Sequence, residues 1–225
     1  MFGGEKNRMD GNESSSTSAG TIRVLVADDH PVVRTGLAAV LVQQADLELV
    51  AEAENGERAV ALYREHQPDV CLMDLRMPVM DGVEAIRAIT TEFPEARILA
   101  LTTYEGDADI RRALEAGARG YLLKDMLLTD VVQSVRAVHH GERVIPNAVA
   151  ARLAEFPERS DLTERELEVL KLVARGLSNK EVARAIGRTD ETVKIHLKNV
   201  FAKLGVADRT EAVTVALTRG LIHLD

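Results

Sequence analysis

Four places in the first half of the chain put carboxylate, hydroxyl or ammonium side chains just past a short apolar run. They are Asp28 with Asp29, Asp74, Thr102 and Lys124. If the runs are parallel strands, these groups all emerge at one edge of one sheet, where open α/β folds bind their ligands. Three carboxylates at one edge repel one another unless a cation neutralises them. Because we find no His or Cys at ligand spacing, the oxygen-only set favours Mg²⁺.

The same residues could hold a phosphoryl group. An aspartate can act as a nucleophile and form an aspartyl phosphate, and with a metal beside it Asp74 is the candidate. The Lys124 ammonium offers a point charge to one phosphate oxygen, and the Thr102 hydroxyl can donate a hydrogen bond to another. Taken alone, Lys124 is more simply a solvated surface lysine and Thr102 an ordinary strand-end residue. Their shared position at strand ends favours the phosphate interpretation.

Ordinary local roles also exist for the acids. Asp29 could be the N-cap of a helix that begins at Pro31, and Asp74 could be a polar residue before a turn at residues 76–78. Capping explains one member of the Asp28 and Asp29 pair, but not both. We therefore favour a joint site, with capping and turn formation as the alternatives.

The elements that would position these residues alternate between strand-like and helix-like from Ile22 onward. Five such alternations predict βαβ units and a parallel sheet. Four of the strand-like runs are almost wholly apolar, whereas the second interleaves polar residues and is predicted to be an edge. Right-handed crossovers then favour a doubly wound, flavodoxin-like α/β sheet of order 2-1-3-4-5, in which the acids meet between strands one and three. The predicted strands are Ile22–Ala27, Leu47–Ala53, Val70–Met73, Arg97–Leu101 and Gly120–Leu123.

The composition is that of two ordinary globular domains. The chain has 225 residues, of which 46% are hydrophobic and 28% charged, so it can bury a core. The single cysteine, Cys71, lies in an apolar run and can form no internal disulfide, which indicates a reducing compartment. No apolar stretch approaches the roughly 20 residues that span a membrane, so we expect a cytoplasmic protein with no membrane partner. Residues 1–20 show no apolar period and predict a disordered tail rather than a signal peptide.

Charge is distributed unevenly along the chain. Residues 161–225 carry 11 Lys and Arg against 10 Asp and Glu, a net of +1, whereas the residues before them carry 17 against 26, a net of −9. The acidic part suits a divalent cation, and a locally basic stretch in the other part could face phosphates.

The second half predicts a helix, a short turn and a helix. Capping boxes open two helices, from Thr163 to Glu166 and from Ser178 to Glu181, and Gly176 lies in the turn between them. A third helix follows, and apolar residues at 4-3-4 spacing define its buried face. These residues are Val193, Leu197, Val200 and Leu204.

The opposite face of the third helix suits a reader of the DNA major groove. Lysines can contact guanine acceptors and phosphates, and an apolar side chain can contact thymine methyl groups. No acid occurs between Thr192 and Ala207, so the face keeps a positive potential; a plain solvated helix face is the alternative. Aromatic residues make up only 3% of the chain, which argues against single-strand binding by stacking. The face consists of Lys194, Ile195, Lys198, Asn199 and Ala202.

The strand-end motifs resemble the receiver domain of bacterial two-component response regulators, over about residues 21–140. The matching segments are Val-Ala-Asp-Asp-His-Pro, Met-Asp-Leu-Arg-Met-Pro-Val-Met-Asp-Gly, Ala-Leu-Thr-Thr and Gly-Tyr-Leu-Leu-Lys-Asp. The resemblance implies that Asp74 accepts a phosphoryl group from a sensor histidine kinase. It also implies that Asp29, Asp74 and the backbone carbonyl of Arg76 hold Mg²⁺, with Asp28 acting through water.

Two further pairs follow from this resemblance. Thr102 and Tyr121 resemble the switch pair, in which the hydroxyl moves toward the phosphoryl group and the aromatic ring follows it inward. Core packing is the alternative role for Tyr121. Arg76 and Tyr104 each lie two residues past an active-site residue and are bulky enough to hinder an attacking water. We therefore predict slow self-dephosphorylation.

Three segments of the second half resemble the LuxR-type helix-turn-helix: Leu-Thr-Glu-Arg-Glu-Leu-Glu-Val-Leu, Gly-Leu-Ser-Asn-Lys-Glu-Val-Ala and Thr-Val-Lys-Ile-His-Leu-Lys-Asn-Val-Phe-Ala-Lys-Leu. Together with the receiver, the chain resembles the NarL/FixJ group of response regulators. The resemblance implies a last helix over Ala212–Ile222 that can pair two copies as a homodimer on double-stranded promoter DNA. Arg188 departs from the pattern, because an apolar residue is expected in that turn. Base contacts are implied for Lys194, Ile195 and Lys198, and phosphate contacts for Lys180, Thr192 and Lys203.

Residues 141–160 are the predicted linker between a receiver over residues 21–140 and a DNA-binding domain over residues 161–225. The linker contains two prolines and a helical stretch over Ala148–Phe156. We expect it to let the receiver cover or release the recognition helix. Phosphorylation of Asp74 would shift that equilibrium and promote a dimer that matches paired half-sites.

Two other classes of protein fit part of the pattern. A phosphatase or phosphomutase of the aspartyl-phosphate type would share the nucleophile and Mg²⁺, but no cap insertion encloses a substrate and the DNA-binding half would be unexplained. A constitutive DNA-binding protein with a vestigial receiver fits less well, because the set of acids is complete. The sequence therefore predicts a phosphorylated transcription factor rather than a turnover enzyme.

Overall fold

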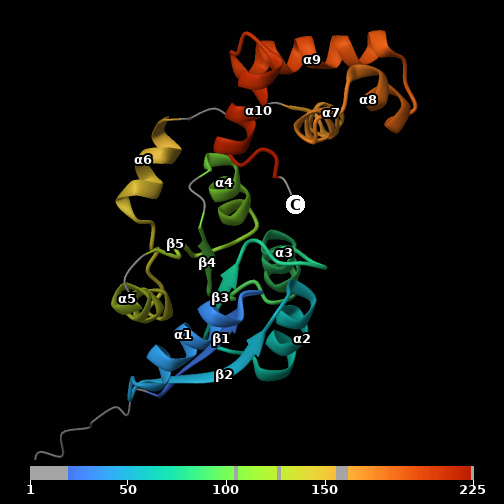
Figure 1. The fold of residues 1–225 in the computed structure, drawn as a ribbon. Coiled ribbons are helices and arrows are strands. Elements are labelled where there is room, and N and C mark those ends of the chain that lie inside the picture. The colour runs from blue at the N-terminus through green and yellow to red at the C-terminus, as the bar shows by residue number, and fades with distance from the viewer. Residues whose placement is uncertain (1–19, 104–105, 126–127, 156–161, 224–225) are drawn as a thin grey trace, which may run out of the picture.

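A computed structural model describes residues 20–103, 106–125, 128–155 and 162–223. The predicted disordered tail, except Gly20, lies outside these residues, as does Tyr104. Within the described part, a sheet flanked by helices occupies the lower half of Figure 1 and a group of four helices occupies the top. We call these the sheet unit and the helical unit.

Five parallel strands form one sheet in the predicted order β2-β1-β3-β4-β5. Three strands have the predicted bounds, β3 ends one residue later than predicted, and β4 both begins and ends one residue later. Asp74 and Thr102 are therefore the last residues of their strands and stay within the hydrogen-bonded ladder. The strands are β1 (Ile22–Ala27), β2 (Leu47–Ala53), β3 (Val70–Asp74), β4 (Ile98–Thr102) and β5 (Gly120–Leu123).

Helices cover both faces of the sheet, which explains the apolar character of its inner strands. In β1, Leu25 and Ala27 belong to one core cluster, and Val24 and Val26 belong to the cluster on the other face. Successive side chains of a strand point to opposite faces, so a strand covered on both faces has few places for a polar residue. The flanking helices are α1 (Pro31–Val42), α2 (Gly56–His66), α3 (Gly82–Glu92), α4 (Asp107–Glu115) and α5 (Leu128–His139).

The edge position predicted for β2 is confirmed. Glu48 and Glu52 of this strand are exposed, whereas every residue of β3, β4 and β5 is buried. At this edge Glu48 and Glu52 reach solvent, whereas β5, at the other edge, is followed outward by an isolated bridge between Gly120 and Val144.

The first part of the predicted linker packs on the sheet unit. Val144 forms a parallel bridge with Gly120, and its carbonyl accepts a hydrogen bond from the Tyr121 N–H at 2.8 Å. The next helix, α6 (Asn147–Glu155), lies beside α4 and buries Val149 completely (Figure 1). It begins one residue earlier than predicted. Residues 156–160 of the predicted linker lie outside the described residues.

The helical unit confirms both predicted capping boxes. The side chain of Thr163 accepts from the Glu166 N–H while the Glu166 carboxylate accepts from the Thr163 N–H, and Ser178 and Glu181 repeat the arrangement. Two small apolar clusters hold the unit together. Its helices are α7 (Glu164–Ala174), α8 (Asn179–Ala185), α9 (Asp190–Leu204) and α10 (Arg209–Thr218).

The prediction of a last helix over residues 212–222 was wrong at both ends. Helix α10 begins at Arg209 because Asp208 is its N-cap and accepts a hydrogen bond from the Glu211 N–H at 2.9 Å. It ends before Gly220, which adopts a left-handed φ of +68° and turns the chain away. The residues that follow α10 are thereby directed toward the sheet unit (Figure 1). Among the helices described, none has both the length and the apolar character needed to cross a membrane.

Candidate functional site

The predicted strand-end residues meet at one edge of the sheet. The Lys124 ammonium lies 2.7 Å from Asp28 Oδ2 and 2.8 Å from Asp74 Oδ2. Asp28 and Asp74 are almost completely buried, at 0% and 2% exposure. Two buried carboxylates therefore share one ammonium group, and this arrangement follows directly from the parallel strand order.

Local backbone packing fixes the position of Asp74. Its Oδ1 accepts a hydrogen bond from the Arg76 N–H at 3.2 Å. The first residue of α3, Gly82, lies so close to the end of β3 that a Cβ there would be 2.0 Å from the Asp74 carbonyl oxygen. Only glycine fits this approach, which brings the N-terminus of α3 against the strand end. A rare γ-turn precedes it, in which Val79 has a φ of +71° and the Met80 N–H donates to the Pro78 carbonyl at 2.8 Å.

His30, rather than Asp29, is the N-cap of α1, so the capping interpretation of Asp29 was wrong. The His30 side chain makes no capping hydrogen bond. Its backbone N–H donates to Asp28 Oδ1 at 2.9 Å, and its Nδ1 lies 2.7 Å from Asp29 Oδ1. The expectation that no histidine lies among the ligands also needs correction. One ligand atom from each of Asp28, Asp29, His30 and Asp74 lies within 4.8 Å of the others.

The cluster contains three carboxyl groups but only one ammonium group, that of Lys124. Burial raises the pKa of the Asp74 carboxyl to about 6, although Lys124 and the Arg76 N–H oppose the rise. Burial alone would lower the pKa of Lys124, but its hydrogen bonds with Asp28 and Asp74 outweigh burial and raise it. Asp29 adds a third carboxylate that is partly exposed. The donor set is dominated by carboxylate oxygens and open on one side, which fits a hard divalent cation.

The predicted switch residues lie next to each other in the core. Thr102 is 1% exposed and Tyr121 is fully buried. Burial raises the pKa of the Tyr121 hydroxyl, and a hydrogen bond with Thr102 partly opposes the rise. The ring therefore already occupies the inward position that the receiver resemblance assigns to the phosphorylated protein.

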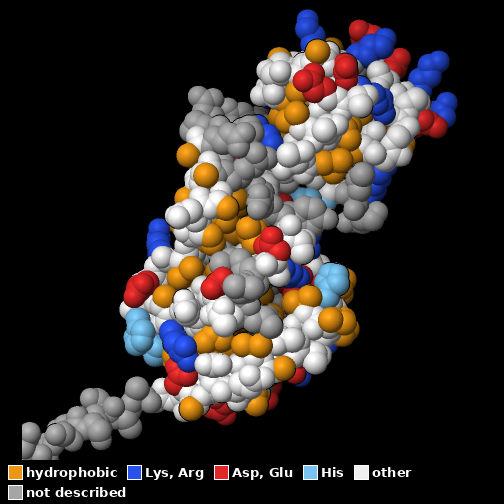
Figure 2. Space-filling view, turned by 60° about the vertical axis from the view of Figure 1, so that its left-hand side comes forward, with side chains coloured by type: hydrophobic (Ala, Val, Ile, Leu, Met, Phe, Trp, Pro, Cys, Tyr) orange, Lys and Arg blue, Asp and Glu red, His pale blue; other side chains and the backbone are white. Residues whose placement is uncertain are grey.

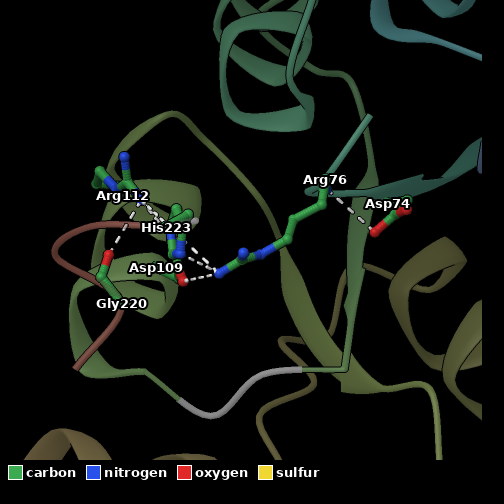
Figure 3. A network of polar contacts seen from close by, with 6 residues as sticks. All are labelled: Asp74, Arg76, Asp109, Arg112, Gly220 and His223. Carbon is green, nitrogen blue, oxygen red and sulfur yellow. Dashed lines mark hydrogen bonds and ion pairs between the residues drawn. The ribbon is translucent and has the colours of Figure 1, made fainter. Parts of the chain in front are cut away.

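The Arg76 side chain points away from Asp74. Figure 3 shows it extending from the end of β3 toward Asp109 of α4 and His223, which follows α10. Its Nη2 lies 3.3 Å from Asp109 Oδ2 and 3.2 Å from His223 Nε2, and it also contacts His223 Nδ1. The prediction was that this bulky side chain hinders a water approaching Asp74, but in this arrangement it extends away from the carboxylate. The partner expected with it, Tyr104, lies outside the described residues.

The contact between the two units was not predicted from the sequence. Arg219, at the end of α10, donates two hydrogen bonds to Asp107 of α4, at 3.1 Å to Oδ1 and 2.9 Å to Oδ2. Both side chains are buried, and the Arg219 carbonyl accepts from the Ala108 N–H at 3.0 Å. Gly106 permits this approach, since a Cβ there would be 2.7 Å from the Arg219 backbone. Arg112 joins the network by contacting Asp109 and the Gly220 carbonyl (Figure 3).

The predicted face of the third helix is exposed. Val193, Leu197 and Val200 of α9 are buried, and Leu204 is partly buried, as the 4-3-4 spacing predicted. On the opposite side Lys194, Ile195 and Lys198 are exposed, and 55% of the Ile195 surface is accessible. Lys and Arg side chains project from the upper right of Figure 2, where the helical unit lies.

In this structure the sheet unit does not cover α9; the prediction allowed both a covered and a released helix. The sheet unit contacts the end of α10, and α9 lies beyond α10 in Figure 1. The surface held in the contact is thus the end of the helix that the LuxR resemblance assigns to pairing.

The other side chains predicted to contact DNA have different neighbours in the structure. Lys180 is exposed in the first turn of α8. The Thr192 hydroxyl lies 2.9 Å from the Thr189 hydroxyl at the start of α9. The Lys194 ammonium lies 3.2 Å from Glu191 and 3.7 Å from Asp190.

Lys203 and Arg188 have roles that the sequence did not indicate. Lys203 pairs with Glu166 Oε2 at 2.8 Å, which ties α9 to the capping box of α7. Burial alone would raise the pKa of Glu166, but Lys203 and Thr163 outweigh it and lower the pKa. Arg188 is exposed beside the turn, so its charge does not disturb the apolar cluster.

Two family models match the chain, one on each unit. The model described as a response regulator receiver domain matches residues 24–136. The model described as bacterial regulatory proteins of the luxR family matches residues 160–216.

Two relatives align with this chain over most of its length. The transcriptional regulatory protein LnrK of Bacillus subtilis (strain 168) is 40% identical over 216 residues, which cover 89% of this chain and 98% of the relative. The response regulator protein VraR of Staphylococcus aureus (strain Mu3) is 42% identical over 208 residues, which cover 90% of this chain and 100% of the relative.

Solved structures are also similar over most of the chain. The response regulator ChrA of a heme-sensing two-component system aligns with a TM-score of 0.55 at 40% identity, over 90% of this chain and 100% of that one. The two-component response regulator RcsB in its complex with DNA aligns with a TM-score of 0.64 at 28% identity, over 88% of this chain and 99% of that one.

Proposed function

Because the chain belongs to the response regulators that join a receiver domain to a LuxR-type DNA-binding domain, we propose that a sensor histidine kinase phosphorylates it on Asp74 and that this modification controls its binding to promoter DNA. The buried Asp74, which shares Lys124 with Asp28, is the observation that carries the proposal. We assign residues 21–140 to the receiver, residues 141–160 to the linker and residues 161–225 to the DNA-binding domain.

The phosphoryl transfer needs a carboxylate nucleophile and cations that receive the charge of the phosphoryl oxygens. An Asp74 oxygen would attack phosphorus as the bond to the kinase histidine nitrogen breaks. Lys124 would pair with one phosphoryl oxygen and Thr102 would donate to another. A bound Mg²⁺ would neutralise the phosphoryl charge, and Asp28, Asp29, Asp74 and the Arg76 backbone carbonyl would hold it.

Recognition of double-stranded promoter DNA would use the exposed face of α9. Lys194, Ile195 and Lys198 would contact bases, and Lys180 and Thr192 would contact phosphates. The position of Lys203 beside Glu166 makes it a structural residue first, and it would reach a phosphate only by leaving that carboxylate. RcsB was solved bound to DNA, which supports a DNA-binding role for this related chain.

Activation would release the end of α10 rather than uncover α9. The buried pair of Arg219 and Asp107 holds α10 against α4, so a homodimer that used this surface would require the contact to open. Phosphorylation would therefore favour the open form and the dimer on DNA.

The first test compares wild type with Asp74→Asn. Each full-length protein is treated with acetyl phosphate and Mg²⁺, and intact mass and binding to duplexes enriched from a randomised DNA pool are measured. We expect one added phosphoryl group and tighter binding for wild type, and neither change for Asp74→Asn. Asp46→Asn is the matched control and should behave as wild type. Asp46 is half-exposed and lies just before β2, at the amino ends of the strands, away from Asp74. Equal stimulation of wild type and Asp74→Asn would instead indicate a constitutive DNA-binding protein.

A further inference from the structure

Arg76 links the phosphoryl-acceptor site to the DNA-binding domain through its two ends. Its backbone N–H donates to Asp74 Oδ1, while its guanidinium contacts Asp109 of α4 and His223 of the DNA-binding domain (Figure 3). A single residue thus touches the acceptor carboxylate and the domain contact.

The tail after α10 forms one wall of the hollow beside the acceptor site. Asp29, Arg76, Asp109, Arg112 and His223 all line this hollow. His223 reaches it because the Arg219 pair with Asp107 and the turn at Gly220 hold the tail against α4. The DNA-binding domain therefore contributes a side chain to the surroundings of the acceptor.

Phosphorylation would create a competitor for the Arg76 guanidinium. An aspartyl phosphate on Asp74 would carry close to two negative charges, whereas the carboxylate that it replaces carries at most one. A guanidinium stays protonated and forms strong paired hydrogen bonds with phosphate oxygens. Asp109 would still have a partner if Arg76 left, because Arg112 also contacts it. The two anionic sites can therefore exchange Arg76 without leaving Asp109 unpaired.

The position of Arg76 determines what a water molecule meets as it approaches the phosphoryl group. Hydrolysis forms a bond between the water oxygen and phosphorus and breaks the bond between phosphorus and Asp74. The products are the carboxylate and inorganic phosphate, and the proton goes to solvent. The attack must come in line, on the side opposite the Asp74 oxygen. A guanidinium drawn across the hollow would occupy that path, whereas one held by His223 leaves it open.

We propose that Arg76 is a positioning residue through which the DNA-binding domain shortens the lifetime of the phosphoryl group on Asp74. In the closed arrangement, Asp109 and His223 hold the guanidinium away from the phosphoryl group. When the domains separate, Arg76 pairs with the phosphoryl oxygens and shields them. This inference rests on the proposed phosphorylation of Asp74 and replaces the simpler expectation that the bulk of Arg76 always hinders water.

The test measures hydrolysis in full-length variants after phosphorylation with acetyl phosphate and Mg²⁺. The donor is removed, and loss of the phosphorylated form is followed by phosphate-affinity electrophoresis. His223→Ala should slow hydrolysis about fivefold, at the low end of typical coupling between sites. Asp107→Asn, which weakens the domain contact at a separate place, should slow it as well. His66→Ala is the matched control, since its side chain is 30% exposed against 26% for His223, and should leave the rate unchanged.

The role of Arg76 itself is tested in a double-mutant cycle. Arg76→Gln keeps the backbone but removes the guanidinium, so His223→Ala should have no further effect on hydrolysis in that background, whereas Arg76→Lys should restore part of it. The inference is overturned if His223→Ala leaves the rate unchanged or raises it, or slows it equally with and without Arg76. A failure to phosphorylate Asp74 at all would refute the proposed function instead, so the two failures are distinguishable.

Discussion

At the scale of single residues, the proposed acceptor site contains two buried carboxylates and a single ammonium group. Asp28 and Asp74 share Lys124, and burial raises the pKa of the Asp74 carboxyl above the ordinary value of an aspartate. A carboxyl group whose pKa is raised by burial is more stable in the folded protein when it is protonated. The folded state therefore loses stability as Asp74 ionises.

This imbalance predicts that Asp74→Asn stabilises the protein at neutral pH. The stabilising effect of protonated Asp74 is fully present below its ordinary pKa and is lost as pH rises through about 6. Asparagine mimics the neutral form, so without metal it should raise the free energy of unfolding by about 3 kcal/mol at pH 7. Urea unfolding of both proteins between pH 4 and 8 measures this difference, which should vanish near pH 4.

Magnesium supplies the internal control for that prediction. It should stabilise wild type more than Asp74→Asn, because the neutral amide removes one charged ligand. A difference in unfolding free energy that stayed constant from pH 4 to 8 would contradict the raised pKa of Asp74.

The residues of the site were predictable where strand order decides their position. Asp28, Asp74, Thr102 and Lys124 follow from apolar runs that end at one sheet edge. The direction of the Arg76 side chain was not predictable, because its partner His223 is 147 residues away. The sequence did contain one overlooked signal, since His30 directly follows the acidic pair.

At the scale of elements, periodicity predicted the strands and the buried face of α9. Strands that are buried on both faces require apolar runs, as in β1, β3, β4 and β5. A helix that is buried on one side requires apolar residues at helical spacing, as in α9. The features that periodicity did not predict depend on tertiary contacts. The bridge between Val144 and Gly120 and the packing of α6 on α4 depend on residues distant in sequence. The end of α10 depends on the left-handed conformation of Gly220, which was not predicted from the sequence.

Substitutions on the exposed face of α9 and on α8 should distinguish base contacts from phosphate contacts. Ile195→Ala should weaken binding to the preferred DNA by about 1 kcal/mol and relax specificity at one base pair. It should leave the unfolding free energy nearly unchanged, because the side chain is 55% exposed. Fluorescence anisotropy with preferred and scrambled duplexes measures the affinity and the specificity.

Lys180→Ala serves as the comparison for Ile195→Ala, because Lys180 is exposed and is the lysine proposed to contact a phosphate. Its loss should weaken binding to all sequences and reduce the salt slope by about 1. If Ile195→Ala instead weakened binding equally on the preferred and scrambled duplexes, a base contact at that position would be rejected.

At the scale of the whole molecule, the domain contact lies at the end of α10 and leaves α9 exposed. The buried Arg219 and Asp107 pair holds the contact, and the Arg76 network connects it to the acceptor site. Two buried charges stabilise a contact only while both are present, so weakening either partner should favour separation. We therefore propose that phosphorylation of Asp74 and separation of the two domains are coupled.

The distance between the domains tests this central claim most directly. Spin labels on Arg87→Cys of α3 and Asn199→Cys of α9, both exposed, report that distance. The native Cys71 is buried and burial raises the pKa of its thiol, so it should not react with the label. Pulsed electron resonance is recorded with and without beryllofluoride and Mg²⁺, as a phosphoryl mimic. We predict a single narrow distance distribution that shifts to longer distances and broadens on addition, and no change in an Asp74→Asn background. An identical distance distribution in both conditions would contradict the account.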